Sequence, residues 1–331
     1  MITSTAHEGL YQGEKAIWLR HGRYEAAILP EIGGNLIAFH DKERNYSFLH
    51  EPEASEMEAF KASPNIHGIP VLYPPNRFED GKFPWNGKVH KLSINETDRH
   101  NHLHGYVSDQ PWTVLNYGSN DQESYVTVQI QVDEQHPVYQ EWPFCFTITM
   151  RYALSASGLS QLLSVRNDGE EALPCLIAFH TAINAPFAPG STAQDYRVKL
   201  TIGEHWEMNE RMLPTGKFLP LTAEEELMKG EGVYPFYEAL DNHYTAVPQQ
   251  GRNRMELRDT KENVTLVYDV GTSYKQWMIW NNSATEGFFC PEPQINLVNA
   301  PNIDMPAEQM GLFSLAKGEI WEEHARLYVL E

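Results

Sequence analysis

The sequence predicts an all-β protein, a large sandwich of antiparallel sheets that forms one domain over residues 1–331. Three observations support this prediction: apolar and polar residues alternate over many segments, turn-forming residues separate these segments, and helix signals are few. The chain has no internal repeat, no low-complexity tract and no linker rich in Gly, Ser and Pro. We therefore predict one continuous β domain.

Alternation with a period of two gives a strand one buried face and one exposed face. The clearest segments with this pattern are 126–132, 144–150, 196–202 and 264–270. In the first of them, valine and isoleucine alternate with threonine and glutamine. We expect each segment to be a single strand.

Turn chemistry separates the predicted strands. Gly33–Gly34 follows Pro30, Asn167–Gly169 lies between two strand patterns, and Pro189–Gly190 precedes another. Glycine, proline, asparagine and aspartate favour tight turns because of their backbone preferences or local side-chain hydrogen bonds. These positions therefore mark connections between antiparallel strands.

Two short helices are expected among the strands. Thr222–Glu225 matches a capping box and leads into a segment that stops at Gly230. A second helix is expected around residues 51–60, an acidic segment whose residues favour helix more than strand.

The formal net charge of the 331 residues is −20, which opposes the phosphates of nucleic acids and of anionic membranes. The sequence contains no stripe rich in Lys and Arg that would reverse this field locally. We therefore expect neither nucleic acid nor membrane as a partner. A neutral small molecule is compatible with this charge, whereas a phosphorylated one requires a local basic pocket.

Cys145, Cys175 and Cys290 are odd in number, far apart and without a CxxC pair, so they indicate neither a disulfide framework nor a zinc ribbon. The N-terminal residues lack a secretory signal pattern, and no apolar run is long enough to span a bilayer. We expect a cytoplasmic protein.

Four stretches crowd polar residues of catalytic type among Gly, Pro and aromatic residues: 68–83, 100–112, 177–187 and 290–302. In their order and spacing they resemble the aldose 1-epimerase (galactose mutarotase) family. The resemblance covers most of the chain and begins at residues 26–39, which are similar to the family's opening strand pair and its Gly-Gly turn. It implies the galactose mutarotase-like β-sandwich, often called a supersandwich, and a free aldose as the small-molecule partner.

The resemblance also implies four substrate-binding residues. Asn76 and Arg77 resemble the family's Asn-Arg pair, in which the arginine binds sugar hydroxyls. His104 resembles a histidine that contacts the sugar, and Asp241 resembles an aspartate that accepts hydrogen bonds from its hydroxyls. Trp277 is a candidate aromatic platform for the sugar ring.

His180 and Glu292 resemble the family's catalytic acid and base. Mutarotation opens and recloses a cyclic hemiacetal, so one group removes the proton of the C1 hydroxyl while another protonates the ring oxygen. A carboxylate and a histidine suit this exchange. Glu292 is the expected base and His180 the expected acid, and no metal or organic cofactor is required.

Simpler interpretations remain for four of these residues. His180 follows an apolar run and fits a core histidine, and Glu292 between two prolines fits a solvated loop carboxylate. Arg77 fits a surface ion pair with Glu79 or Asp80. Asp241 also fits a turn, since Asp-Asn pairs commonly stabilise turns.

The sequence also contains candidates for two other types of site. His100, His102 and His104 would share one face of a strand and could form a metal site, although only His104 matches the family motif. Cys290 lies two residues before Glu292, but a lone cysteine without a histidine partner fits a small buried residue better than a nucleophile.

Three rival functions stay open. A hexose-6-phosphate 1-epimerase would need basic residues in the pocket, for which Lys82 and Lys88 are the candidates. A non-catalytic sugar-binding protein of the same fold is another, and a glycoside hydrolase using Asp241 and Glu292 is the third. The preferred aldose and the oligomeric state, monomer or homodimer, also stay open.

Overall fold

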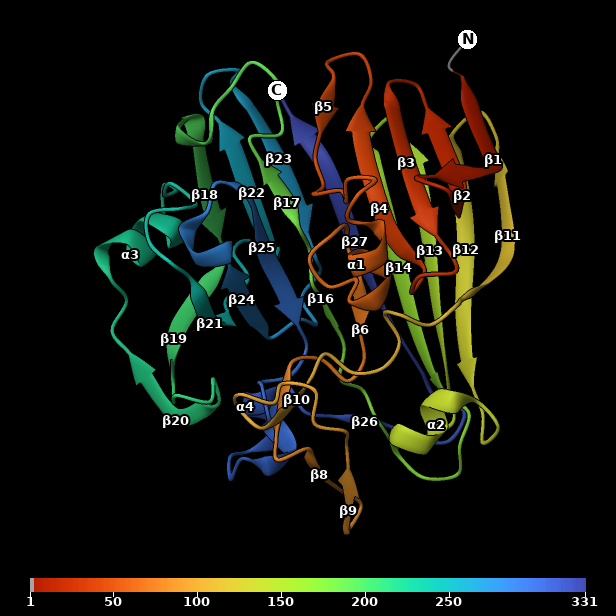
Figure 1. Cartoon of the computed structure of the whole chain (residues 1–331). Coiled ribbons are helices and arrows are strands. Elements are labelled where there is room, and N and C mark those ends of the chain that lie inside the picture. The colour runs from red at the N-terminus through yellow and green to blue at the C-terminus, as the bar shows by residue number, and fades with distance from the viewer. Residues whose placement is uncertain (1–2) are drawn as a thin grey trace.

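Two layers of antiparallel sheet face each other in the computed structural model of the chain, which describes residues 3–331 (Figure 1). One layer is an eight-stranded sheet. In spatial order its strands are β11 (Thr113–Ser119), β12 (Glu123–Val132), β13 (Phe146–Ser155), β14 (Gly158–Asn167), β27 (Ile320–Leu330), β23 (Val264–Asp269), β22 (Arg254–Asp259) and β18 (Tyr196–Leu200).

The opposite layer consists of two sheets side by side (Figure 1). The first contains β1 (Ser4–Tyr11), β2 (Glu14–His21), β3 (Tyr24–Leu29), β4 (Asn35–Asp41) and β5 (Tyr46–Ser47). The second contains β20 (Pro214–Leu219), β19 (Ile202–Met208), β21 (Asp241–Ala246), β24 (Gln276–Trp280), β25 (Gly287–Gln294), β16 (Ala178–Phe179) and β6 (Val71–Leu72), with β17 (Ile183–Ala185) paired to β25. This is the predicted all-β sandwich.

Three strand pairs and a few short helices complete the structure. The pairs are β7 (Arg77–Glu79) with β10 (Asn101–Leu103), β8 (Lys82–Trp85) with β9 (Lys88–Lys91), and β15 (Leu173–Pro174) with β26 (Ser314–Leu315). The helices are α1 (Met57–Ala62), α2 (Pro137–Glu141), α3 (Ala223–Lys229), α4 (Ala307–Met310), and the 3-10 turns η1 (Ala193–Asp195), η2 (Asn282–Ala284) and η3 (Ala300–Asn302). Within residues 3–331, each helix is too short to cross a lipid bilayer.

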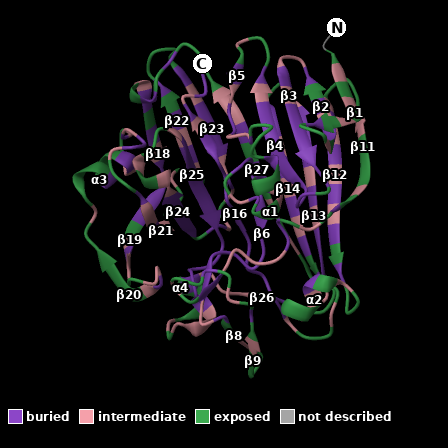
Figure 2. Ribbon diagram, in the orientation of Figure 1, coloured by how far each residue is buried: buried purple, intermediate pink, exposed green. Residues whose placement is uncertain are grey.

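The strands bury their apolar faces between the two layers (Figure 2). In β12, Val126, Val128, Ile130 and Val132 are buried and the residues between them are partly or fully exposed. This is the alternation that the sequence shows, and hydrophobic burial at ~25 cal/mol per Å² is the main force that holds the layers together.

The helix expected after Thr222 is α3. The Thr222 hydroxyl accepts a hydrogen bond from the Glu225 amide at 3.2 Å, and the Glu225 carboxylate accepts one from the Thr222 amide at 2.8 Å. Gly230 follows as the C-cap. The capping box and the glycine stop therefore identified both ends of this helix.

Two predicted boundaries are wrong. The helix expected at 51–60 forms later, at Met57–Ala62, because helix propensity without a capping signal does not fix where a helix begins. The strand expected over 196–202 is two strands, β18 and β19, which belong to different layers. The break is at Thr201, whose hydroxyl donates to Asn253 Oδ1 at 2.6 Å as the chain passes between the layers.

The Gly33–Gly34 turn has a steric reason. Both glycines have positive φ values, +65° and +59°, and a Cβ at Gly33 would lie 2.1 Å from the carbonyl oxygen of Ser108. Only glycine fits such a close approach of two backbone segments.

Candidate active site

A cavity of about 240 Å³ lies at the surface of the sheet that contains β21, β24 and β25. Its lining residues are Ser63, Asn65, Ile66, Asn76, Arg77, Leu103, His104, His180, Asp241, Met278, Trp280 and Glu292. All six residues predicted for the site are among them. The wider surface depression beside Trp112 and Leu10 has three titratable lining residues, Glu8, Lys15 and Glu31.

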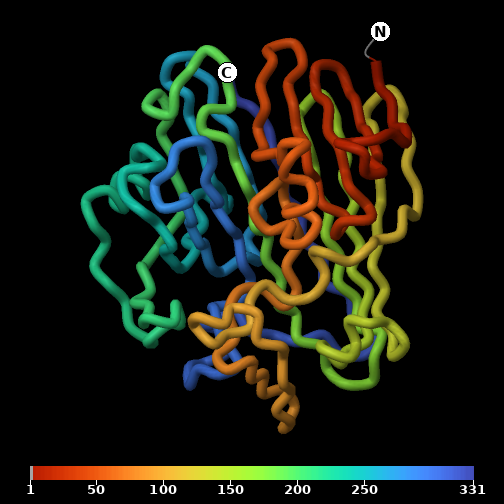
Figure 3. Tube along the Cα trace, viewed as in Figure 1, coloured from red at the N-terminus to blue at the C-terminus, as the bar shows by residue number. Residues whose placement is uncertain are grey.

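Segments far apart in the sequence meet here. Figure 3 shows the orange segment that contains β7 and β10 beside the blue C-terminal segment. Hydrogen bonds join the two: the Glu79 amide donates to Asn299 Oδ1 at 3.1 Å, and Asn302 Nδ2 donates to the Lys82 carbonyl at 2.8 Å. The segment that carries Arg77 is thereby held against the residues that follow β25, the strand that carries Glu292.

Strand register determines which side chains face the cavity. Partners in neighbouring antiparallel strands point to the same face, and so do residues two apart in one strand. Across β21, β24 and β25, two rows of partners follow this rule: Asp241, Trp280 and Cys290 in one row, and His243, Met278 and Glu292 in the next. Both rows therefore share the face on which the cavity lies.

His180 reaches Glu292 through the pairing of β16 with β25. Ala178 pairs with Gln294 in antiparallel register, so His180, two residues after Ala178, comes opposite Glu292, two residues before Gln294. His180 Nε2 lies 3.2 Å from Glu292 Oε1, and the two residues are 6% and 3% exposed. Glu292 is thus buried at the cavity wall and is not a solvated loop residue. His180, although buried, has a carboxyl partner that a plain core histidine lacks.

Burial shifts the pKa values of this pair toward the neutral forms. Desolvation lowers the pKa of His180 to about 4, with Asp241 opposing this shift and Arg77 adding to it. Desolvation raises the pKa of Glu292 well above its ordinary value, helped by Asp241 and opposed by Arg77. Both shifts favour the form with a protonated Glu292 and a neutral His180 over the ion pair with the proton on His180.

His104 contacts the same region from the opposite side. Its ring centroid is 5.3 Å from that of His180 in an edge-to-face arrangement. Its amide donates to the Asn76 carbonyl at 3.0 Å, which ties it to the Asn76–Arg77 segment. Burial lowers the pKa of His104 well below its ordinary value, so this imidazole is neutral.

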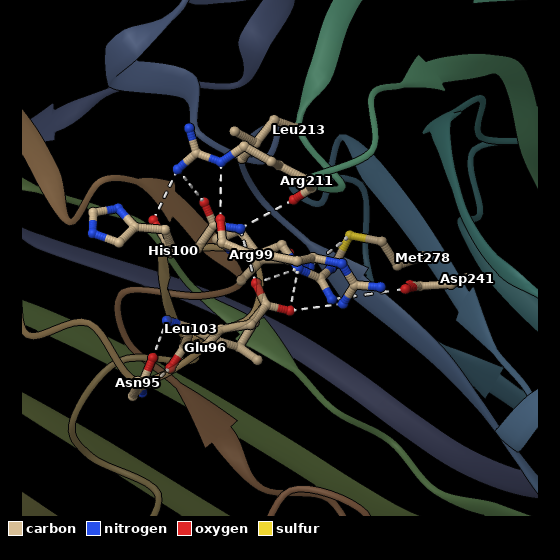
Figure 4. A network of polar contacts seen from close by, with 12 residues as sticks. Asn95, Glu96, Arg99, His100, Leu103, Arg211, Leu213, Asp241 and Met278 are labelled. Atoms are coloured by element: carbon tan, nitrogen blue, oxygen red, sulfur yellow. Dashed lines mark hydrogen bonds and ion pairs between the residues drawn. The ribbon is translucent and has the colours of Figure 1, made fainter.

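Arg77 is held by two carboxylates on different segments, those of Glu96 and Asp241, which Figure 4 labels. Its Nε donates to both oxygens of Glu96, at 3.0 and 3.1 Å, and its Nη2 lies 3.7 Å from Asp241 Oδ2. Two contacts on one guanidinium leave few ways for it to rotate. Asp241 itself begins strand β21 and is not a turn residue.

The alternative ion pairs of Arg77 with Glu79 or Asp80 are wrong. Both carboxylates contact Arg211 instead, Glu79 at 3.0 Å and Asp80 at 2.9 Å. Arg211 follows β19 in the sequence and was not a candidate from the sequence, because no local pattern links it to β7.

Glu96 is a site-supporting residue that the sequence did not indicate. It is buried beneath Arg77 and accepts further hydrogen bonds from Arg99 at 3.0 Å and from Asn101 at 2.8 Å (Figure 4). Glu96 lies outside the four polar stretches. The only feature of the sequence that could have pointed to it is its position, four residues before the 100–112 stretch. Three cationic or amide donors fix its carboxylate, and it in turn orients Arg77.

The three-histidine metal site is wrong. His100 and His104 have left-handed backbone conformations, with φ of 55° and 68°, which break the alternation that would align the three rings. His100 is exposed and contacts Asp80 at 3.1 Å, while His102 is bonded to the Ser93 carbonyl at 2.8 Å. Of the three, His104 lines the cavity.

Trp277, the candidate aromatic platform, does not face the cavity. Trp277 is fully buried and its indole donates to Asn253 Oδ1 at 2.7 Å, so it faces the core and not the cavity. Trp280, three residues later and on the opposite face of β24, lines the cavity. Its ring centroid lies 6.3 Å from that of His180.

Comparison with protein families gives a match to the aldose 1-epimerase family over residues 15–328, nearly the whole chain. The chain belongs to this family. The six site residues that the resemblance implied all line the cavity.

Solved structures of family members share the fold. A galactose mutarotase-like protein from Clostridium acetobutylicum is 30% identical, with 98% of each chain covered and a TM-score of 0.94. A galactose mutarotase-like protein from Lactobacillus casei ATCC 334 is 17% identical, with 95% of this chain and 100% of that chain covered and a TM-score of 0.71. At that identity the second likeness establishes the fold alone.

Among curated proteins, the uncharacterized protein YihR of Escherichia coli K12 is 24% identical over 203 residues. The match covers 61% of this family member and 59% of YihR, so less than two thirds of that relative's length is spanned.

Proposed function

We propose that this family member is an aldose 1-epimerase, a mutarotase that interconverts the α and β anomers of a free hexose such as glucose or galactose. The observation that carries the proposal is the 3.2 Å contact between His180 Nε2 and Glu292 Oε1 at the wall of the cavity. Mutarotation removes a proton from the C1 hydroxyl and adds a proton to the ring oxygen, and both oxygens are bonded to C1. A buried acid and a buried base side by side suit this pair of transfers.

The proton count of the pair fits this chemistry. With the shared proton on His180, Glu292 accepts the proton of the C1 hydroxyl while His180 protonates the ring oxygen, and the C1–O bond to the ring opens. Glu292 is then protonated and His180 neutral, which is the charge state that burial favours. Rotation about the C1–C2 bond presents the other carbonyl face, and the two transfers run in reverse.

Other lining groups provide the means to hold a sugar. Arg77 offers donors to hydroxyls in a fixed direction because Glu96 restrains it, and Asp241 offers carboxylate oxygens as acceptors. Asn76 and His104 extend this polar wall. The indole of Trp280 is an apolar surface for the apolar face of a pyranose ring.

The charge of the cavity supports an unphosphorylated substrate. Lys82 and Lys88 contact Asp80 at 3.0 Å and Glu171 at 2.5 Å, and neither lines the cavity. Arg77 is the one Lys or Arg among the described lining residues, and Glu96 and Asp241 already balance it. A sugar phosphate would bring two further negative charges into a site with no free cation.

Polarimetry on freshly dissolved α-glucose and α-galactose tests the proposal. We expect the protein to accelerate the approach to the equilibrium rotation for at least one of the two. Higher kcat/KM for glucose-6-phosphate would favour the hexose-6-phosphate epimerase. Sugar binding by calorimetry without any acceleration would favour a binding protein.

A further inference from the structure

Cys290 takes no part in the proposed proton transfers, yet it lies beside both residues that do. It is two residues from Glu292 on the same face of β25, and it is fully buried. The ligand-type atoms of His180, Cys290 and Glu292 lie within 4.8 Å of one another. Within residues 3–331, these three form the one such group of three His, Cys, Asp or Glu side chains.

The spacing of these atoms is close to that of ligands on one metal ion. Tetrahedral zinc has bonds of about 2.0–2.3 Å, which places neighbouring ligand atoms roughly 3.3–3.6 Å apart. His180 Nε2 and Glu292 Oε1 are already at 3.2 Å. The thiol sulfur would have to approach by about 1 Å, a rotamer-scale movement.

The donor set selects the class of ion. One imidazole nitrogen, one sulfur and one carboxylate oxygen match borderline-soft ions such as Zn²⁺ and Co²⁺, whereas Mg²⁺ and Ca²⁺ prefer sites made of oxygen alone. A thiolate and a carboxylate also neutralise a divalent charge in a buried place. His180 and Glu292 line the cavity, so a fourth position would be open to water or to a sugar hydroxyl.

We propose that His180, Cys290 and Glu292 form a binding site for Zn²⁺ and that the bound ion inhibits the enzyme. The ion takes the Nε2 lone pair of His180 and a carboxylate oxygen of Glu292, the two atoms that mutarotation uses. The proton that the His180–Glu292 pair carries and the proton of the Cys290 thiol are both released to solvent. Zinc binding and turnover are therefore mutually exclusive. The inhibition rests on the proposed mutarotase function, whereas the binding does not.

Cobalt spectroscopy on the untagged full chain tests the binding. Only a cysteine ligand gives a thiolate-to-cobalt charge-transfer band, so binding to histidines other than His180, among the 14 of the chain, does not interfere. We expect the band in the wild type and in Cys145→Ala, the half-buried control cysteine, and we expect it to be absent in Cys290→Ala and Cys290→Ser. Absence of the band from the wild type would overturn the site.

Polarimetry with added Zn²⁺ tests the inhibition. We expect inhibition competitive with sugar, no effect of Mg²⁺, and basal activity retained in Cys290→Ala with a loss of zinc sensitivity of about tenfold or more. Equal sensitivity of Cys290→Ala and the wild type would overturn the proposal. A cobalt band without any mutarotation would support the metal site and refute the proposed function. Mutarotation without a cobalt band would support the proposed function and refute the metal site.

Discussion

His180 and Glu292 lie 3.2 Å apart, Nε2 to Oε1, and burial moves their pKa values in opposite directions, down for the histidine and up for the carboxyl. The pair can therefore exist as two neutral groups or as an ion pair with the same number of protons. An isomerase that works by acid–base catalysis needs a pair of this kind, in which one residue gives up a proton while the other accepts one.

Glu292→Gln is expected to keep the fold and sugar binding while lowering kcat for mutarotation by ~10² or more, because an amide has the shape of the carboxyl and cannot accept the C1 hydroxyl proton. Polarimetric rates and calorimetric sugar affinity measure the two effects separately. Near-native kcat in this variant would remove Glu292 from the role of base.

The pH dependence of kcat/KM is expected to show a wide plateau. As pH falls toward the lowered His180 pKa of about 4, the pair gains a second proton and loses its base. As pH rises through the raised Glu292 pKa, the pair loses its last proton and has no acid. Rates corrected for spontaneous mutarotation give these limbs as values of the coupled pair. An acid limb near the ordinary histidine pKa of ~6.5 would contradict the burial argument.

His180→Asn is expected to retain binding and to lose turnover, because asparagine keeps a polar side chain of similar reach without a group that titrates near neutrality. The acid limb of the pH profile should vanish or move. If kcat/KM and the profile are both unchanged, His180 is structural and His104, 5.3 Å away between ring centroids, becomes the first candidate for the acid.

Glu96→Gln is expected to raise KM about tenfold with a smaller change in kcat, because Arg77 loses a charged partner that fixes its direction but never touches the reacting atoms. Glu79→Gln is the matched control, since Glu79 contacts Arg211 in the same network and not Arg77. Similar KM increases in both variants would indicate a general loss of loop order and not a specific role for Glu96.

Glu292→Gln is also expected to raise the free energy of unfolding at pH values above the unfolded-state pKa of ~4.3. The unfolded chain releases the Glu292 proton near pH ~4.3, whereas the folded chain retains it to higher pH, so this group costs stability increasingly as pH rises between the two pKa values. The Tm difference between variant and wild type should be small near that lower pKa and should grow toward neutral pH. Thermal unfolding followed by circular dichroism checks this, and a pH-independent difference would argue against a raised pKa.

Short-range patterns were sufficient for the class of fold and for part of its detail. Alternation of apolar residues identified β12, and the capping box with its glycine stop identified both ends of α3. Where the local signal was propensity alone, as at 51–60, the helix existed but its start was misplaced. Alternation over 196–202 also concealed the break at Thr201, because a strand that changes layers can keep its period.

The sequence by itself determined that the chain is a β protein with six residues of a known family's site, and all six line one cavity. Only the tertiary structure decided that Glu96 and not Glu79 restrains Arg77, and that Trp280 and not Trp277 lines the cavity. The physical reason is that period-two patterning tells which residues share a face but not which face is covered or which distant strand lies alongside. Those depend on the register of β21, β24 and β25 and on loops that cross them, and both are set by contacts between residues far apart in the chain.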